Sequence, residues 1–143
     1  MAEFLTTSGT SHNLENIIIE AKYNITLVSP YLQISKTLFE RLKEAALRRV
    51  KIKIVYGKDD LKQNERKSLE AINALQLYYF ENLHAKCYFN EKTMVITSMN
   101  MYEFSERKNR EMGILIDHKI DKNIYDKAEK EVNSILQFLL QLF

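Results

Sequence analysis

The sequence predicts an α/β fold in which helices flank a mixed central β-sheet. In the first half, segments with apolar residues at helical spacing alternate with strand-like segments, which favours parallel strands joined by helices. In the second half, strand-like segments follow one another directly, which favours antiparallel pairing within the same sheet. With three glycines and one proline the chain has little material for a linker, so we expect residues 1–143 to form a single domain.

The first half carries clear signals for helices and strands in turn. Leu14 and Ile17 share a helical face behind Ser11, a residue type that commonly caps a helix N-terminus. β-branched residues then run together until Pro30, as in a buried strand that proline ends. The expected order is a helix at 11–22, a strand at 24–32, a helix at 35–49, a strand at 50–57 and a helix at 59–76.

The second half contains short strand candidates and a long C-terminal helix. Each strand candidate is rich in β-branched and aromatic residues and is bounded by polar residues. Ala128, Val132 and Leu136 lie on one side of the helix. The expected order is strands at 77–80, 84–89 and 93–98, a polar loop or short helix at 100–109, a strand at 110–117 and a helix from about Asp121.

Bulk composition argues against several classes of protein. Cys87 is the single cysteine, so we expect no intrachain disulfide and no cysteine-rich metal site. No basic region precedes a long apolar run at the N-terminus, and no run approaches the roughly 18 apolar residues that span a bilayer. We therefore expect a cytoplasmic protein without a signal peptide and without stable membrane insertion.

The charge distribution is a weak guide to a partner. A net charge of +2 is too small to indicate nucleic acid by itself. The cations gather in two groups, of which the first fits an ordinary solvated surface. These groups are Arg48, Arg49, Lys51 and Lys53, and then Arg107, Lys108 and Arg110.

Four polar residues have a spacing that suits phosphate chemistry. Side chains alternate along a strand, so His84 and Lys86 are expected on one side, about 6.5 to 7 Å apart. Histidine is neutral or charged near pH 7 and lysine is a long-stemmed cation, so the pair can engage one phosphate. Ser98 and Asn100 repeat this spacing at the end of the next strand. If the two strands pair around "NEK", the four side chains converge at one end of the sheet.

Each of these pairs alone is a weak signal. A short His-x-Lys occurs by chance, and an isolated Ser-x-Asn usually reflects turn chemistry at a strand end. The ordered set is more informative, because Glu111 opens the following strand at the same end. We expect its carboxylate to accept a hydrogen bond from the unused nitrogen of His84.

This ordered set resembles the motif of the phospholipase D superfamily, which reads His-x-Lys, four residues, Asp, six residues, Gly-Ser-x-Asn. His84 and Lys86 match its start, and Ser98 and Asn100 match its end. The run "NREMGILI" looks like the strand that carries the supporting glutamate of the family, which is Glu111 here. The expected mixed sheet between helices is also similar to that of the family.

Two positions depart from the family motif. The motif aspartate falls at Glu91, or at Asn90 if the shorter gap is placed after it. The resemblance implies that this residue is structural. The glycine before the motif serine is replaced by Thr97, which affects how closely backbone and phosphate approach there.

The resemblance also implies an assembly and a mechanism. A single motif copy is similar to the small bacterial nuclease branch, in which two identical chains pair their motifs. One His84 then attacks phosphorus and forms a phosphohistidine, and His84 of the second chain protonates the leaving oxygen. Lys86, Ser98 and Asn100 hold the non-bridging oxygens, and Glu111 keeps the attacking imidazole in its tautomer. No metal or other cofactor is implied, and His12 and His118 match no family site.

The substrate class is left open by the sequence. Arg107, Lys108 and Arg110 beside the site suit a polyanion, which favours an endonuclease acting on DNA or RNA. A phospholipase is the weaker enzymatic alternative, with Tyr102 and Phe104 facing a membrane; these residues could equally stack bases or pack in the core. The departures motivate a third hypothesis, a homodimer that keeps the fold, has lost the chemistry and binds or scaffolds nucleic acid.

Overall fold

The computed structural model describes residues 1–58, 61–101, 109–137 and 139. Within this part of the chain the strands form one sheet in the order β1-β7-β6-β5-β2-β3-β4. The strands are β1 (Glu3–Leu5), β2 (Asn24–Val28), β3 (Lys51–Tyr56), β4 (Leu75–Tyr79), β5 (Cys87–Asn90), β6 (Thr93–Thr97) and β7 (Gly113–Asp117). The helices are α1 (Thr7–Glu20), α2 (Lys36–Leu47), α3 (Gln63–Glu70) and α4 (Lys122–Gln137).

The sheet is mixed, as the sequence predicts. β2, β3 and β4 are parallel, and helices connect them in sequence. β5 pairs antiparallel with β2 and with β6, and β7 pairs antiparallel with β6 and β1. Because β5 runs opposite to β2, the start of β5 lies beside the carboxyl end of β2. This arrangement gathers several chain segments at one end of the sheet.

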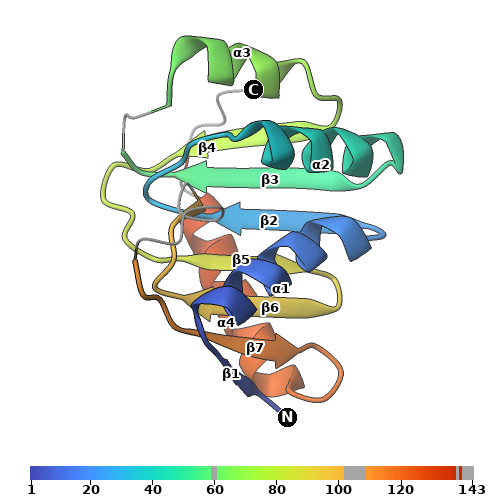
Figure 1. The fold of residues 1–143 in the computed structure, drawn as a ribbon, viewed down its shortest axis with the longest axis vertical. Coiled ribbons are helices and arrows are strands. Elements are labelled where there is room, and N and C mark those ends of the chain that lie inside the picture. Colours follow the sequence, from blue (N-terminus) through green and yellow to red (C-terminus); the bar gives the residue numbers. More distant parts are fainter. Residues whose placement is uncertain (59–60, 102–108, 138, 140–143) are drawn as a thin grey trace.

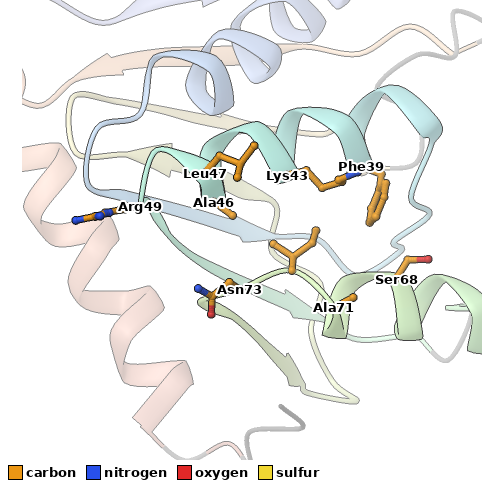
Figure 2. A pocket seen from close by; sticks show the side chains of 9 residues that line it. Phe39, Lys43, Ala46, Leu47, Arg49, Ser68, Ala71 and Asn73 are labelled. Carbon is orange, nitrogen blue, oxygen red and sulfur yellow. The ribbon is translucent and has the colours of Figure 1, made fainter.

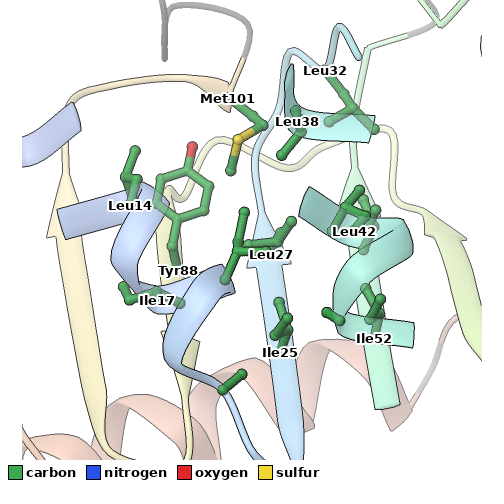
Figure 3. Close-up of a cluster of buried hydrophobic side chains, with 14 of the residues drawn as sticks. Leu14, Ile17, Ile25, Leu27, Leu32, Leu38, Leu42, Ile52, Tyr88 and Met101 are labelled. Atoms are coloured by element: carbon green, nitrogen blue, oxygen red, sulfur yellow. The ribbon is translucent and has the colours of Figure 1, made fainter. Parts of the chain in front are cut away.

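Helices cover both faces of the sheet (Figure 1). α1 and α2 lie on one face, where Leu14 and Leu42 pack with Ile25, Ile52 and other buried residues of the sheet. Figure 3 shows this cluster, in which the Tyr88 ring from β5 lies beside side chains of α1. α4 lies on the opposite face and forms a second, smaller apolar cluster with β5, β6 and β7. The prediction of an α/β sandwich with a mixed sheet is therefore confirmed.

Several expected boundaries are wrong. The sequence does not predict β1, because three residues at a sheet edge are too few to establish a periodic pattern. α1 begins at Thr7 rather than after Ser11, since the side chain of Thr6 accepts the N–H of Gly9. α3 ends at Glu70, and Leu75 already belongs to β4.

The early end of α3 has a local cause. Ala74 has a φ of 64°, a left-handed conformation that ends the turns after the helix and directs the chain into β4.

Arg48, which belongs to the first group of cations, has a structural role. Its guanidinium donates to the carbonyl oxygens of Ile18 and Ala21, 2.9 and 3.2 Å away, and so ties the end of α2 to the end of α1.

Candidate active site

The four motif residues lie at one end of the sheet because of how β5 and β6 pair. Cys87 is opposite Ile96 in the register, and the N–H of Thr97 donates to the carbonyl oxygen of Lys86 at 3.4 Å. The antiparallel pair therefore brings the segment before β5 beside the segment after β6. The expected pairing around "NEK" is confirmed.

His84 and Lys86 precede β5 rather than lying within it, contrary to the strand expected at 84–89. The His84 side chain is exposed and Lys86 is half-buried. The ammonium group of Lys86 lies 3.4 Å from the carbonyl oxygen of His84, so it is held near the histidine. Among the described residues the imidazole makes no hydrogen bond, which leaves it open to a ligand.

The segment that carries His84 is anchored by the buried residue before it. Leu83 is 3 % exposed, and its N–H donates to the carbonyl oxygen of Phe80 at 3.0 Å. Gly57, at the end of β3, lies against it so closely that an added Cβ would come within 2.7 Å of the Leu83 Cβ. Position 57 therefore requires a glycine, because any side chain there would collide with Leu83. The close packing of Leu83 against Gly57 sets the position of the backbone at the next residue, His84.

Ser98 and Glu111 meet directly at this end of the sheet. The Ser98 hydroxyl donates to the Glu111 carboxylate at 2.9 Å, and the N–H of Met112 lies 3.2 Å from the same hydroxyl oxygen. The backbone of Glu111 is held from α1, where the Thr7 hydroxyl oxygen accepts its N–H at 2.8 Å. The expected hydrogen bond from Glu111 to the His84 imidazole is not present in the described part of the chain; Ser98 occupies the carboxylate instead.

Two residues that sequence reasoning missed hold the backbone around Asn100. The Tyr88 hydroxyl is buried and donates to the carbonyl oxygen of Met99 at 2.7 Å. Ser29, which follows β2, accepts the N–H of Met101 at 2.9 Å. Asn100 itself is 8 % exposed. Tyr88 shares the alternation of His84 and Lys86, so a hydroxyl pointing to the same side of the chain was the available signal.

The cations expected near the site are only partly described. Arg110 is exposed and directly precedes Glu111. Arg107 and Lys108 lie outside the described residues, as do Tyr102 and Phe104. The structure therefore carries one member of this group at the site.

The other histidines serve elsewhere. His12 is on the exposed side of α1, where its ring contacts the Asn16 side chain at 3.1 Å. His118 stacks on the Tyr125 ring with centroids 3.8 Å apart and contacts the Asp126 carboxylate at 3.1 Å. The latter group lies at the opposite end of β5 and β6, beside Glu91.

Both candidates for the motif aspartate have structural roles. The Asn90 side chain is buried, donates to the carbonyl oxygen of Ile17, and accepts the N–H groups of Lys92 and Thr93. The Glu91 carboxylate accepts backbone N–H groups of the α1–β2 connection at 2.9 to 3.1 Å, from Lys22, Tyr23 and Asn24. These bonds tie the β5–β6 turn to the rest of the fold, far from His84.

Thr97 occupies the position of the motif glycine, and its hydroxyl group makes two hydrogen bonds. The hydroxyl donates to the carbonyl oxygen of Met112 and accepts the N–H of Met99 at 3.0 Å. It therefore braces the end of β6 against β7, next to Ser98.

The pKa of the Glu91 carboxyl group is lowered in the folded protein. Burial raises its pKa, but the hydrogen bonds from the N–H groups of Lys22, Tyr23 and Asn24 outweigh burial, and the net pKa is below its ordinary value of 4.5. A carboxyl whose pKa falls on folding stabilises the fold above its unfolded pKa. That contribution is lost as the pH falls through the folded-state pKa, so Glu91 favours folding at neutral pH and ceases to do so in acid.

We expect Glu91→Gln to destabilise the protein at pH 7 by about 2 kcal/mol, because hydrogen bonds to a charged acceptor weaken and the amide NH₂ opposes a backbone donor. The measurement is thermal unfolding of both proteins at pH 7 and in acid. The difference in Tm should shrink as the pH falls below 4.5, the ordinary pKa of a glutamate, and through the lower pKa of Glu91 in the folded state. Lys92→Gln, in the same turn, is the control. An equal gap at both pH values would contradict a role for the ionised carboxylate.

Other features of the structure lie away from this end of the sheet. A pocket of about 580 Å³ opens between α2 and the turn after α3, where Phe39, Leu47 and Ala71 line it (Figure 2). No predicted site residue lines it. Within the described ranges, no group of three or more His, Cys, Asp or Glu side chains could hold a metal ion. No described helix is both long and apolar enough to cross a membrane.

A His-x-Lys and a Ser-x-Asn held together at the end of a mixed sheet between helices define a phospholipase D-like domain. Residues 14–136 match the family described as "Cardiolipin synthase, PLD-like domain". The chain therefore belongs to the phospholipase D superfamily, and the expectation from the motif is confirmed. No curated protein matches the chain.

Solved structures share the fold at low sequence identity. NucT from Helicobacter pylori is 14% identical with a TM-score of 0.81, and the match covers 98% of both chains. Nuc from Salmonella typhimurium, a phospholipase D family member, is 18% identical with a TM-score of 0.69 over 93% of this chain and 95% of that one. TrmBL2, an archaeal chromatin protein with a novel mode of DNA binding, is 14% identical with a TM-score of 0.73 over 98% of this chain and 54% of its own.

Proposed function

We propose that this protein is a metal-independent phosphodiesterase, most simply an endonuclease acting on DNA or RNA, with a site shared by two copies of the chain. The observation that carries the proposal is the β5–β6 register. It brings the segment with His84 and Lys86 beside the segment with Ser98 and Asn100, at the sheet end where Glu111 also lies. The family assignment supports the phosphodiester class.

The chemistry needs a nucleophile, a proton donor and positive charge at the phosphate. The imidazole of one His84 attacks phosphorus, and the bond from phosphorus to the leaving oxygen breaks. The protonated His84 of the second chain gives that oxygen its proton. It then accepts a proton from water, which attacks the phosphohistidine and restores both imidazoles.

The remaining residues bind and orient the phosphate. Lys86 and the donors at Ser98 and Asn100 face the non-bridging oxygens, where negative charge is concentrated. Glu111 accepts the Ser98 hydroxyl at 2.9 Å in the structure. In the proposed reaction its carboxylate moves to the imidazole N–H, which fixes the tautomer that attacks.

Nucleic acid is the favoured substrate because cations flank the motif. Arg110 is exposed next to Glu111, and Arg107 and Lys108 precede it in the sequence. Several cations beside one cut suit a backbone with several phosphates. TrmBL2, which shares this fold over 54% of its own length, is a DNA-binding protein. The description of the matched family as cardiolipin synthase favours a phospholipid substrate as the second candidate.

The test is hydrolysis in the presence of excess chelator, with single- and double-stranded DNA, RNA and phospholipid vesicles as substrates. We expect cleavage of a nucleic acid at a rate that chelation does not reduce, because imidazole and lysine supply the chemistry. Activity that disappears with chelator and returns with a divalent metal would reject the mechanism. Release of a phospholipid headgroup without nucleic-acid cleavage would support the second candidate, and binding without cleavage the scaffolding hypothesis.

A further inference from the structure

An exposed aromatic residue lies beside the candidate active site, just after the strand that neighbours β5. Tyr31 follows β2 and is 43 % exposed. β2 and β5 are antiparallel, with Val28 opposite Cys87. The segment after Val28 therefore continues beside the segment before Cys87, which carries His84 and Lys86. Neighbouring strands of a sheet lie about 4.8 Å apart, so Tyr31 is within reach of a ligand bound at the motif.

A single buried hydroxyl group connects the backbone of Tyr31 to the motif. The Ser29 hydroxyl donates to the carbonyl oxygen of Tyr31 at 2.6 Å and accepts the N–H of Met101 at 2.9 Å. Ser29 is fully buried. Met101 directly follows Asn100, so the same hydroxyl group holds both the end of the motif and the segment with Tyr31. The position of Tyr31 relative to the motif is therefore fixed by the fold.

A cation is held next to Tyr31 by the following strand of the sheet. β2 and β3 end on the same side of the sheet (Figure 1). The carbonyl oxygen of Pro30 accepts the N–H groups of Gly57 and Lys58 at 3.0 and 2.8 Å, and the Lys58 side chain is exposed. Because β3 pairs with β2 on the side away from β5, the order along this end of the sheet is His84, Tyr31, Lys58.

We propose that Tyr31 stacks on a nucleobase next to the cut and so makes the site selective for single strands, with Lys58 binding a flanking phosphate. The proposal rests on the proposed function, in which the motif binds a phosphodiester of nucleic acid. Aromatic side chains stack on bases of any sequence, because every base has a π face. A single strand offers that face, whereas the bases inside a duplex are already stacked on one another.

The chemistry around Tyr31 favours a nucleic acid over a lipid surface. A nucleotide presents a base beside its phosphate, and Tyr31 and Lys58 offer an aromatic ring and a cation at neighbouring positions. A membrane contact would instead require a contiguous apolar patch. Pro30 and Leu32 are buried and Gln33 is exposed, so this connection presents the ring beside polar groups.

The experiment measures binding of labelled single-stranded DNA, single-stranded RNA and duplex DNA by fluorescence anisotropy. The parent protein is the full chain with His84→Ala, so that no substrate is cut. Tyr31→Ala should weaken binding of a single strand by roughly 5- to 150-fold, the range of base–aromatic stacking, and leave duplex binding unchanged. Tyr31→Phe should retain the affinity of the parent, because stacking needs the ring and not the hydroxyl group.

Tyr23→Ala is the matched control, since Tyr23 is 67 % exposed and precedes β2 at its opposite end. Tyr31→Leu covers the case in which Tyr31→Ala does not fold, because leucine keeps apolar bulk without an aromatic face. It should show the same loss for single strands. Lys58→Gln should lower the slope of log affinity against log salt by about 0.7, the value for one phosphate of a single strand. Tyr31→Leu should leave that slope unchanged, because stacking involves no charge.

The affinity of the parent in Tyr31→Leu, or an equal loss for single strands and duplex, would overturn the proposal. So would a parent protein that binds phospholipid vesicles and no nucleic acid. Loss of single-strand selectivity in Tyr31→Leu, when the wild type cleaves no phosphodiester, would leave the stacking role standing and reject only the proposed catalysis.

Discussion

His84→Ala should abolish phosphodiester hydrolysis, with a loss on the order of 10⁴-fold or more. In the proposed mechanism the change removes both the nucleophile and the proton donor, because each comes from a copy of His84. The fold should survive, since the side chain is exposed, lies outside β5 and makes no hydrogen bond among the described residues. The measurements are the single-turnover rate and the Tm of the variant and the wild type.

His12→Ala provides the matched control, because His12 is also exposed but lies on α1. It should keep the activity of the wild type. A labelled phosphodiester quenched during turnover should leave its label on the wild-type protein in an acid-labile, alkali-stable form, and none on His84→Ala. Retention of more than a tenth of the activity by His84→Ala would rule out its role as nucleophile.

The fold could be predicted largely because its signals are local. Helical spacing in α2 and β-branched runs in β2 and β3 are strong patterns, and their alternation limits the topologies that a sheet can adopt. β1 was missed because its position depends on pairing with β7, more than 100 residues away along the chain. Edge pairing is a tertiary effect, and three residues carry little propensity of their own.

The sequence was sufficient to predict which residues form the site, but not which hydrogen bonds these residues make. The spacing of His84, Lys86, Ser98 and Asn100 required only that two neighbouring strands pair, and they do. The hydrogen-bond partner of Glu111 depends on where β7 begins relative to β6. In the structure this places the Glu111 carboxylate beside the Ser98 hydroxyl, which donates a hydrogen bond to it. The structural role of Glu91 could not be predicted either. Its carboxylate accepts hydrogen bonds from backbone N–H groups after α1, and their position depends on the tertiary fold.

Lys86→Ala should slow hydrolysis by about 10²- to 10³-fold, the range measured for other groups that stabilise charge in the transition state. Lys86 is half-buried, and its ammonium group is held 3.4 Å from the His84 carbonyl oxygen, so its charge is directed to this site. Lys92→Ala, in the β5–β6 turn at the other end of the strand, should have no effect. Equal losses from both variants would indicate a general effect of charge rather than a contact with the phosphate.

Dimers mixed from His84→Ala and Lys86→Ala chains should stay nearly inactive. In a site shared by two chains, such a dimer holds one histidine and one lysine, so it lacks either the nucleophile or the acid. In two independent sites, each chain would carry a single defect, and the slower rate of the Lys86→Ala chain would persist unchanged. The decisive comparison adds dimers of wild-type and His84→Ala chains, purified with two different tags. Under the shared-site mechanism these also fall to near zero, because one wild-type chain supplies only one His84. Activity near half that of the wild type in this dimer would show that each chain works independently, and the paired-histidine mechanism would be wrong while membership of the superfamily stood.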